Sequence, residues 1–411
     1  MPAVGNGAAG MMPVDDEGSY RGHRAFAAYS GGDWSLRFYS REAVPQPGEV
    51  VDGVSVDDVY PAAAFDDAPW LEHACEIEVV KVVDEGISPG SMRGWFAGCA
   101  NLISCELSRL DTSKVVDMSW MFYGCESLGS VDLSGFDTSG AEDMCSMFGN
   151  CASLRTLDLS VLDASAVVRM DGLLSGCGSL VGVDLSGFDT SSAATMDGMF
   201  QGCSSLFEVD LSSFDTRQVE DMSWMFEGCC MLSSLDLSGF GTDNVRDMGS
   251  MFRGCENLRR IDLSGFDTRL VASFERMFCG CEKLRRLDLS GFSVSKGADI
   301  GGMFWDCCRL SRLECAGLSF EDAQAPKVHP FERCWRLPKG QIADIMGGLP
   351  YGCRVDCEHC GDYFWHYIVF GAGNVPKGAV TPGFMVAKLL MVLAGWTCSV
   401  AILIWLVKAL S

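Results

Sequence analysis

A column of carboxylates is the first feature of this chain that could bind a ligand. Acidic residues recur every 26 residues, each between two aliphatic positions, as Glu106, Asp132, Asp158, Asp184, Asp210, Asp236, Asp262, Asp288 and Glu314. Alternate side chains of a strand point to one face, so these carboxylates are predicted to project together, away from the aliphatic side chains. At a strand spacing of about 4.8 Å, neighbouring carboxylates would repel each other by about 0.9 kcal/mol in water.

Two interpretations of this face remain open. Arg260, Arg286 and Arg312 precede the last three acids by two residues and can neutralise the column locally, and serines follow the acids by two residues. In the first interpretation the face is solvated and each Asp bonds to a neighbouring Ser. In the second, the aspartates and the three arginines bind a cationic or polyhydroxylic partner. Calcium fits less well, because its sites take about six to eight oxygen ligands, more than a flat strand supplies.

A group of cysteines near the end of the sequence is a second candidate site. Cys334, Cys353, Cys357 and Cys360 could supply the four ligands of a tetrahedral zinc ion, and the last two form a C-x-x-C. A second C-x-x-C is missing, so the zinc pattern is weak, and a disulfide or, more in keeping with the pattern, free cysteines in a capping segment are the alternatives. We predict no cofactor, with zinc as the one ion that the pattern allows.

Composition argues against catalysis and against nucleic acid. The five histidines, at positions 23, 73, 329, 359 and 366, all lie outside the repeats, and no phosphate-binding G-x-x-x-x-G-K-[ST] is present. Asp and Glu number 55 against 31 Lys and Arg, a formal charge of -24 that repels phosphate backbones. We therefore expect neither an enzyme nor a nucleic-acid-binding protein.

The columns exist because the chain repeats itself every 26 residues. The cysteines Cys99, Cys125, Cys151, Cys177, Cys203, Cys229, Cys255, Cys281 and Cys307 are separated by eight equal intervals. A period in the twenties predicts a solenoid of the leucine-rich-repeat kind. The nine cysteines are predicted to be buried in its core as small hydrophobic side chains.

Each coil is predicted to hold a short helix and a short strand. In the unit from Asp117 to Phe136, Met118, Met121, Phe122 and Cys125 have the i, i+3, i+4, i+7 spacing of one helix face. Asp117 is the expected N-cap and Gly124 the expected end of a helix of about two turns. Leu128, Val131 and Leu133 then follow L-x-x-L-x-L, which predicts strands that pair in parallel into one long sheet.

The repeat resembles a known family. The sequence L-D-L-S-G-F-D-T followed by D-M-S-x-M-F-x-G-C-x-x-L is similar to the repeats of BspA-like (DUF285) bacterial surface proteins over about residues 90–320. Phe136 and its equivalents replace the Asn or Cys of ordinary leucine-rich repeats, which suggests an aromatic spine in place of an asparagine ladder. The resemblance implies a surface-exposed binding or adhesion protein, commonly anchored to the envelope, without catalysis.

Five segments are predicted, in an α/β leucine-rich-repeat solenoid. They are a flexible leader (1–30), an N-terminal α+β cap (31–94), about nine coils (95–320), a Cys-rich C-terminal cap and linker (321–382) and a transmembrane helix (384–408). Within the last segment, Leu389–Val407 is a run of 19 uncharged, mostly apolar residues. Such a run is long enough for a hydrocarbon core of about 30 Å, and a buried core helix is the alternative.

The side of the membrane that the coils face stays open. No signal peptide is visible in residues 1–30, and Lys377 and Lys388 precede the span while Lys408 follows it, which favours a cytoplasmic array. The family resemblance favours the cell surface. We predict a single-pass, membrane-anchored surface protein that binds a protein or glycan on its sheet face. The alternative is a tail-anchored interaction scaffold facing the cytoplasm.

Overall fold

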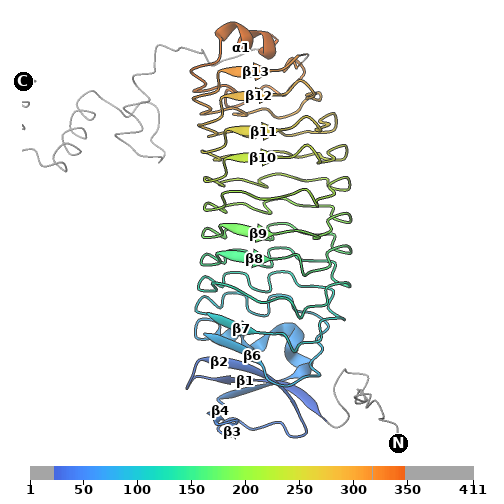
Figure 1. Ribbon diagram of the computed structural model, residues 1–411, viewed down its shortest axis with the longest axis vertical. Coiled ribbons are helices and arrows are strands. Elements are labelled where there is room, and N and C mark those ends of the chain that lie inside the picture. Colours follow the sequence, from blue (N-terminus) through green and yellow to red (C-terminus); the bar gives the residue numbers. More distant parts are fainter. Residues whose placement is uncertain (1–22, 317, 348–411) are drawn as a thin grey trace, which may run out of the picture. The chain divides into compact units, whose positions relative to one another are not determined.

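The computed structural model describes residues 23–316 and 318–347, which form a stack of coils beginning at a small N-terminal sheet (Figure 1). The predicted span Leu389–Val407 and the cysteines Cys353, Cys357 and Cys360 lie outside these residues. None of the helices in the described part of the chain has the length and apolar character needed to span a membrane.

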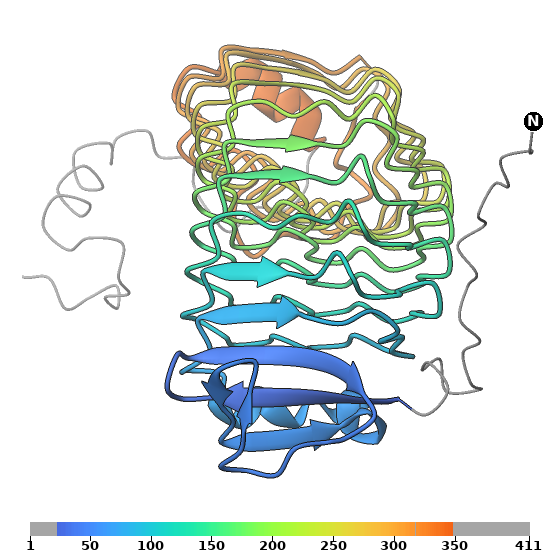
Figure 2. The same cartoon turned by 60° about the horizontal axis from the view of Figure 1, so that its bottom comes forward.

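The N-terminal cap is a sheet that continues into the solenoid. Its five strands are β1 (Arg24–Ser30), β2 (Ser35–Arg41), β5 (Asp58–Pro61), β6 (Val79–Val82) and β7 (Ser104–Glu106), in the order β5-β1-β2-β6-β7. β1 pairs antiparallel with β2 and β5, whereas β2–β6 and β6–β7 are parallel. A hairpin of β3 (Val50–Val51) and β4 (Val54–Ser55) extends the cap, which lies at the near end of the stack in Figure 2. Because β7 already belongs to the first coil, the cap covers the open end of the solenoid core.

An aromatic cluster fastens the cap to the first coil. Two 3-10 helices, η1 (Ala62–Asp67) and η2 (Pro69–His73), meet at Ala68, whose φ of 43° turns the chain. The indole Nε1 of Trp70 donates to the carbonyl oxygen of Trp95 at 2.6 Å, and the Phe38 ring lies 5.2 Å from both indoles. β1 lies inside the predicted leader, so the boundary predicted at residue 31 is wrong.

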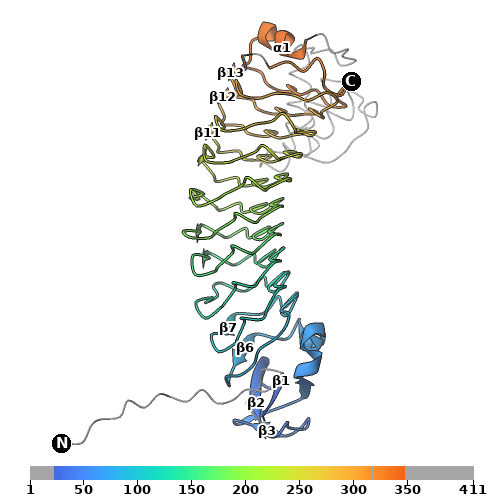
Figure 3. The ribbon, with the colours of Figure 1, turned by 90° about the vertical axis from the view of Figure 1, so that its right-hand side faces the viewer.

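The strands of the coils after β7 are short and pair only in twos. β8 (Thr156–Asp158) pairs with β9 (Gly182–Asp184), β10 (Ser234–Asp236) with β11 (Arg260–Asp262), and β12 (Arg286–Asp288) with β13 (Arg312–Glu314), all parallel. The predicted continuous sheet is therefore wrong, although the strands share one side of the stack (Figure 3). Each strand ends early because the N–H two residues after its Asp bonds to that Asp carboxylate, as at Ser160 and Asp158.

The predicted helix in the first half of each coil is also wrong. In residues 117–124 the chain makes successive turns, with Trp120 at a φ of 59° and Gly124 at 74°, values that an α-helix does not allow. The backbone N–H groups of residues 118, 120, 122 and 124 bond instead to carbonyls of the next coil, at 2.7–2.9 Å. Hydrogen bonds between coils thus replace hydrogen bonds along a helix, which would be marginal at this length. In the described part of the chain, the α-helical segment is α1 (Lys339–Met346).

The predicted interior columns are confirmed. All nine cysteines of the column have an exposed fraction of 0%. The residues Phe136, Phe188, Phe214, Phe240, Phe266 and Phe292 are buried, and rings of this spine stack 6.2–6.3 Å apart where Phe214 meets Phe240 and Phe266 meets Phe292. A second aromatic column runs through Phe122 and Phe226, with centroids 5.4 Å apart between Phe200 and Phe226. The spacing that suggested a helix therefore identified the buried side chains correctly.

Candidate functional site

The carboxylate column lies exposed on the strand side of the stack. One oxygen, Oδ1, of each aspartate accepts the backbone N–H of the serine two residues later, at 2.9–3.0 Å, for Asp132, Asp158, Asp184, Asp210, Asp236, Asp262 and Asp288. The Asp-to-Ser bonds of the first interpretation are thus present. Within the described residues, Oδ2 of these aspartates accepts no hydrogen bond, so one oxygen per coil is available to a ligand.

Hydrogen bonding favours the charged form of several aspartates in this column. The backbone N–H and hydroxyl of Ser134 hold the pKa of Asp132 below its usual value, and Ser212 does the same for Asp210. For Asp184 the larger contribution to the lowered pKa is the hydroxyl of Ser186. An open hollow of about 530 Å³ over β8 and β9 is lined by Asp158, Asp184 and Asp210, together with small polar and aliphatic residues. This part of the face suits a cationic or hydroxyl-bearing partner.

The strand side of the last three coils carries basic residues beside the acidic column. Arg260, Arg286 and Arg312 are exposed on β11, β12 and β13. Arg312 Nε lies 2.9 Å from Glu314 Oε1, whereas Arg260 and Arg286 form no ion pair with any described carboxylate. The expected neutralisation of the acidic column is therefore seen at Arg312 alone among the three.

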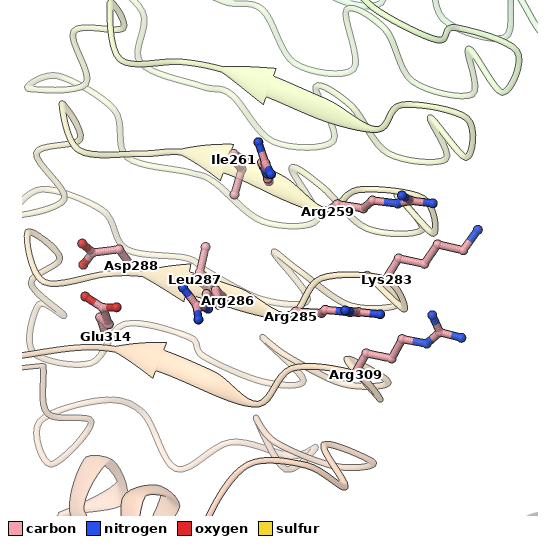
Figure 4. A pocket seen from close by; sticks show the side chains of 10 residues that line it. Arg259, Ile261, Lys283, Arg285, Arg286, Leu287, Asp288, Arg309 and Glu314 are labelled. Carbon is pink, nitrogen blue, oxygen red and sulfur yellow. The ribbon is translucent and has the colours of Figure 1, made fainter.

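Four more basic residues join them, which our sequence reasoning missed. Arg259, Lys283, Arg285 and Arg309 line an open hollow of about 660 Å³ together with Arg260 and Arg286 (Figure 4). In the figure the long basic side chains gather where the strands begin, and Asp288 and Glu314 lie towards the strand ends. The signal was present in the sequence as L-R-R at residues 258–260 and again at 284–286.

The cysteine column has no chemistry to offer a ligand. From Cys125 to Cys307, each column thiol donates to the carbonyl oxygen of the residue 29 positions earlier, at 3.0–3.2 Å. Burial raises the pKa of the Cys99 and Cys177 thiols to about 12 and that of Cys203 well above its usual value. The thiols are therefore structural hydrogen-bond donors that stay protonated at neutral pH.

Alkylation tests this assignment. In the folded chain at pH 8, iodoacetamide should modify exposed Cys75 and leave the nine column cysteines unmodified, because burial excludes the reagent and suppresses the thiolate. Peptide mass spectrometry gives the occupancy of each site, and the same reaction in denaturant is the control that should modify all of them. Modification of Cys203 at the rate of Cys75 would contradict the structure.

The cysteine cluster proposed for zinc is only partly described. Cys334 is buried, and its thiol donates to the Phe304 carbonyl oxygen at 2.9 Å, which extends the column by one coil. Its three proposed companions lie outside the described residues, so the zinc site stays a prediction. Within residues 23–316 and 318–347, no group of three or more potential metal ligands comes together.

A comparison with models of protein families shows to which family these repeats belong. The model described as "Mycoplasma protein of unknown function, DUF285" matches residues 90–180, 150–235 and 230–314, which together are more than half of the chain. This chain belongs to the DUF285 family. The resemblance to BspA-like leucine-rich-repeat proteins predicted from the sequence is thereby confirmed.

Two solved structures of bacterial leucine-rich-repeat proteins are similar to this DUF285 chain. The leucine-rich repeat protein of T. pallidum is 19% identical, with 50% of this chain and 86% of that chain covered and a TM-score of 0.28. The leucine-rich repeat protein of Eubacterium ventriosum is 15% identical, with 76% and 87% covered and a TM-score of 0.30. A comparison with curated proteins found no match.

The DUF285 coils combine buried positions that repeat in every coil with a strand-face position that varies. The position two residues before each column acid reads, coil by coil, Ser104, Ser130, Thr156, Gly182, Glu208, Ser234, Arg260, Arg286 and Arg312. The buried positions of Cys99 and Leu102, by contrast, hold one residue type in all nine coils. One rigid frame thus presents a surface whose charge changes from coil to coil, as in solenoids that bind along an extended face.

Proposed function

We propose that this chain is a non-catalytic recognition protein that binds a protein or glycan on the strand face of its solenoid. The variation of the strand face over the repeated buried Cys and Leu positions carries this proposal. A preformed surface loses little conformational entropy on binding, so even dispersed polar contacts contribute to affinity. The two hollows, one acidic and one basic, both lie on this face and favour it as the ligand side.

We further propose that Leu389–Val407 anchors the chain in a membrane with the solenoid on the cell surface. The length and apolar composition of that run support the anchor. Membership of the DUF285 family, which the sequence resemblance associates with surface proteins, supports the outward orientation. The lysines before and after the run support the alternative, a scaffold that faces the cytoplasm.

Adherence of cells that display the full chain tests the binding face. Such cells should adhere to at least one member of a panel of immobilised glycoproteins and glycans. The double variant Asp184→Lys/Asp210→Lys should reduce adherence by at least about fivefold, because it reverses two charges of the acidic hollow. The control Glu126→Lys/Glu142→Lys, with exposed acids away from the strands, makes the same charge change. Equal losses in both variants would contradict the proposal.

Protease treatment of intact cells tests the orientation. Digestion of the solenoid from outside is the expected result, followed by immunoblotting against an epitope within the coils. Complete protection in intact cells, with digestion after lysis, would overturn the surface placement and favour the cytoplasmic scaffold.

A further inference from the structure

The hollow on the last coils concentrates positive charge on a strongly acidic chain. Its lining holds six basic side chains against two acidic ones, whereas the whole chain has a formal charge of -24. Arg259 and Arg285 occupy equivalent positions one coil apart, as do Arg260 and Arg286, so the backbones of each pair are separated by about one strand spacing, about 4.8 Å. The hollow thus gathers several guanidinium groups and not a single exposed arginine.

The arginines of this hollow are not neutralised by carboxylates of the described residues. Arg259, Arg260, Arg285, Arg286 and Arg309 form no ion pair with a described carboxylate. Other arginines differ: Arg217 pairs with Asp215 and Arg269 with Asp267, each on a turn of its coil. Placing like charges side by side costs free energy, and an anionic ligand would offset that cost.

The lining also limits the kind of anion. Ile261 and Leu287 are its apolar residues, and none of the large exposed hydrophobic side chains of the described chain belongs to it. Protein partners are usually held by buried aromatic or aliphatic anchors, and single-stranded nucleic acids by stacking on aromatic rings. The hollow offers neither, so charge and hydrogen bonding must supply the recognition.

We propose that this basic hollow binds an anionic glycan, one whose sugars carry carboxylate or sulfate groups. Guanidinium groups hold such oxyanions through paired hydrogen bonds. Asp288 and Glu314, at the strand ends of the same hollow, can accept hydrogen bonds from sugar hydroxyls (Figure 4). The inference rests on the proposed recognition function and narrows its ligand class, at a subsite separate from the acidic hollow.

Direct binding of defined oligosaccharides tests this assignment. Full-length chain in detergent micelles is titrated with a heparin-derived oligosaccharide, an oligogalacturonate and a neutral dextran oligosaccharide at physiological ionic strength. At least one of the two anionic probes should bind saturably and the dextran should not, and binding should weaken with added salt. The comparison of heparin with oligogalacturonate distinguishes sulfate from carboxylate recognition.

Matched variants locate the binding. Arg260→Gln/Arg286→Gln should weaken binding at least about tenfold, because charge-assisted hydrogen bonds are lost. The control Arg217→Gln/Arg269→Gln removes the same charge from two exposed, ion-paired arginines and should stay within about twofold. All four arginines are exposed, so melting temperatures should hardly change and a folding defect is separable from a binding defect.

Several results would overturn the inference. It is wrong if neither anionic probe binds, if the two double variants lose equal affinity, or if a polyglutamate peptide binds more tightly than both anionic glycans. If cells still adhere through the acidic hollow while these probes fail, the proposed recognition function stands and only the glycan subsite is rejected. If adherence is insensitive to Asp184 and Asp210 while the glycan binds at the arginines, the glycan subsite stands and the acidic face is rejected.

Discussion

Replacing Phe226 with alanine is expected to lower the free energy of unfolding by about 3–5 kcal/mol. The Phe226 side chain is fully buried, and its ring stacks between those of Phe200 and Phe252 at centroid distances of 5.4 and 5.8 Å. The coils on either side are held at a fixed separation by backbone hydrogen bonds such as Phe226 N–H to the Met251 carbonyl, at 2.9 Å. Because these coils cannot collapse onto the vacated space, a cavity remains and its cost adds to the lost burial.

Phe207 provides the matched control for this substitution. It belongs to the coil before that of Phe226 but is 54% exposed, so Phe207→Ala should change the free energy of unfolding by no more than about 0.5 kcal/mol. Denaturant titration of the full chain, followed by circular dichroism, gives both values. Similar effects of the two substitutions would mean that the Phe226 column does not form the core of the stack.

Most of the structure that could be predicted from the sequence follows from its 26-residue repeat. A column that repeats without insertion must face the same environment in every coil, so the burial of Cys203 or Leu206 follows from the repeat alone. The local conformation did not follow, because Met118, Met121, Phe122 and Cys125 face inwards equally well from a helix or from tight turns. The left-handed conformation of Trp120 and the backbone hydrogen bonds to the next coil show that the segment forms turns. Neither feature can be recognised from the spacing of apolar residues.

The candidate site was predictable where it depended on one column and not where it depended on several. Asp158 and its equivalents share a single position of the repeat, so their exposure and their bonds to serine could be inferred. The basic hollow combines three positions of the repeat, which bring together Arg259 with Arg285, Arg260 with Arg286, and Lys283 with Arg309 when the coils are stacked. Because the sequence was compared one repeat position at a time, Arg260 and Arg286 were identified but the other basic residues of the hollow were not.

A pair of carboxyl groups on the turn side of the coils was also missed. Asp171 and Asp197 occupy the same position of successive coils, in two M-D-G sequences. Burial, followed by the hydrogen bond and charge of Asp171, raises the pKa of Asp197 to about 7, and the charge of Asp221 acts in the same direction. Arg169 Nε lies 3.3 Å from Asp171 Oδ2, while the buried Oδ1 of Asp171 accepts no bond from a described N–H or hydroxyl group. A proton on Asp197 removes the repulsion between the two charges and can donate a hydrogen bond to Asp171.

The pH dependence of stability follows from this proton. The folded chain retains it up to a pH of about 7, whereas Asp197 in the unfolded chain releases it near its usual pKa of 3.8. Between these values the folded state binds more protons, so the Asp197 contribution lowers the free energy of unfolding as the pH rises from about 4 to 7. Above that range the contribution stays constant, and at pH 8 folding confines a second charge beside Asp171.

Asp197→Asn is therefore expected to raise the free energy of unfolding at pH 8 by about 2 kcal/mol, a value reduced for partial contact with water, and to change it little near pH 4. The amide can still donate a hydrogen bond to Asp171, so the substitution removes the charge and keeps the contact. Denaturant titrations between pH 4 and pH 8 measure the difference.

Asp210→Asn is the control. The pKa of exposed Asp210 is lowered, so the stabilising contribution of this carboxylate is lost only as the pH falls to acidic values. Its curve should run parallel to that of the unmodified chain from pH 5 to pH 8. If the Asp197→Asn curve runs parallel as well, the shared proton between Asp171 and Asp197 does not exist.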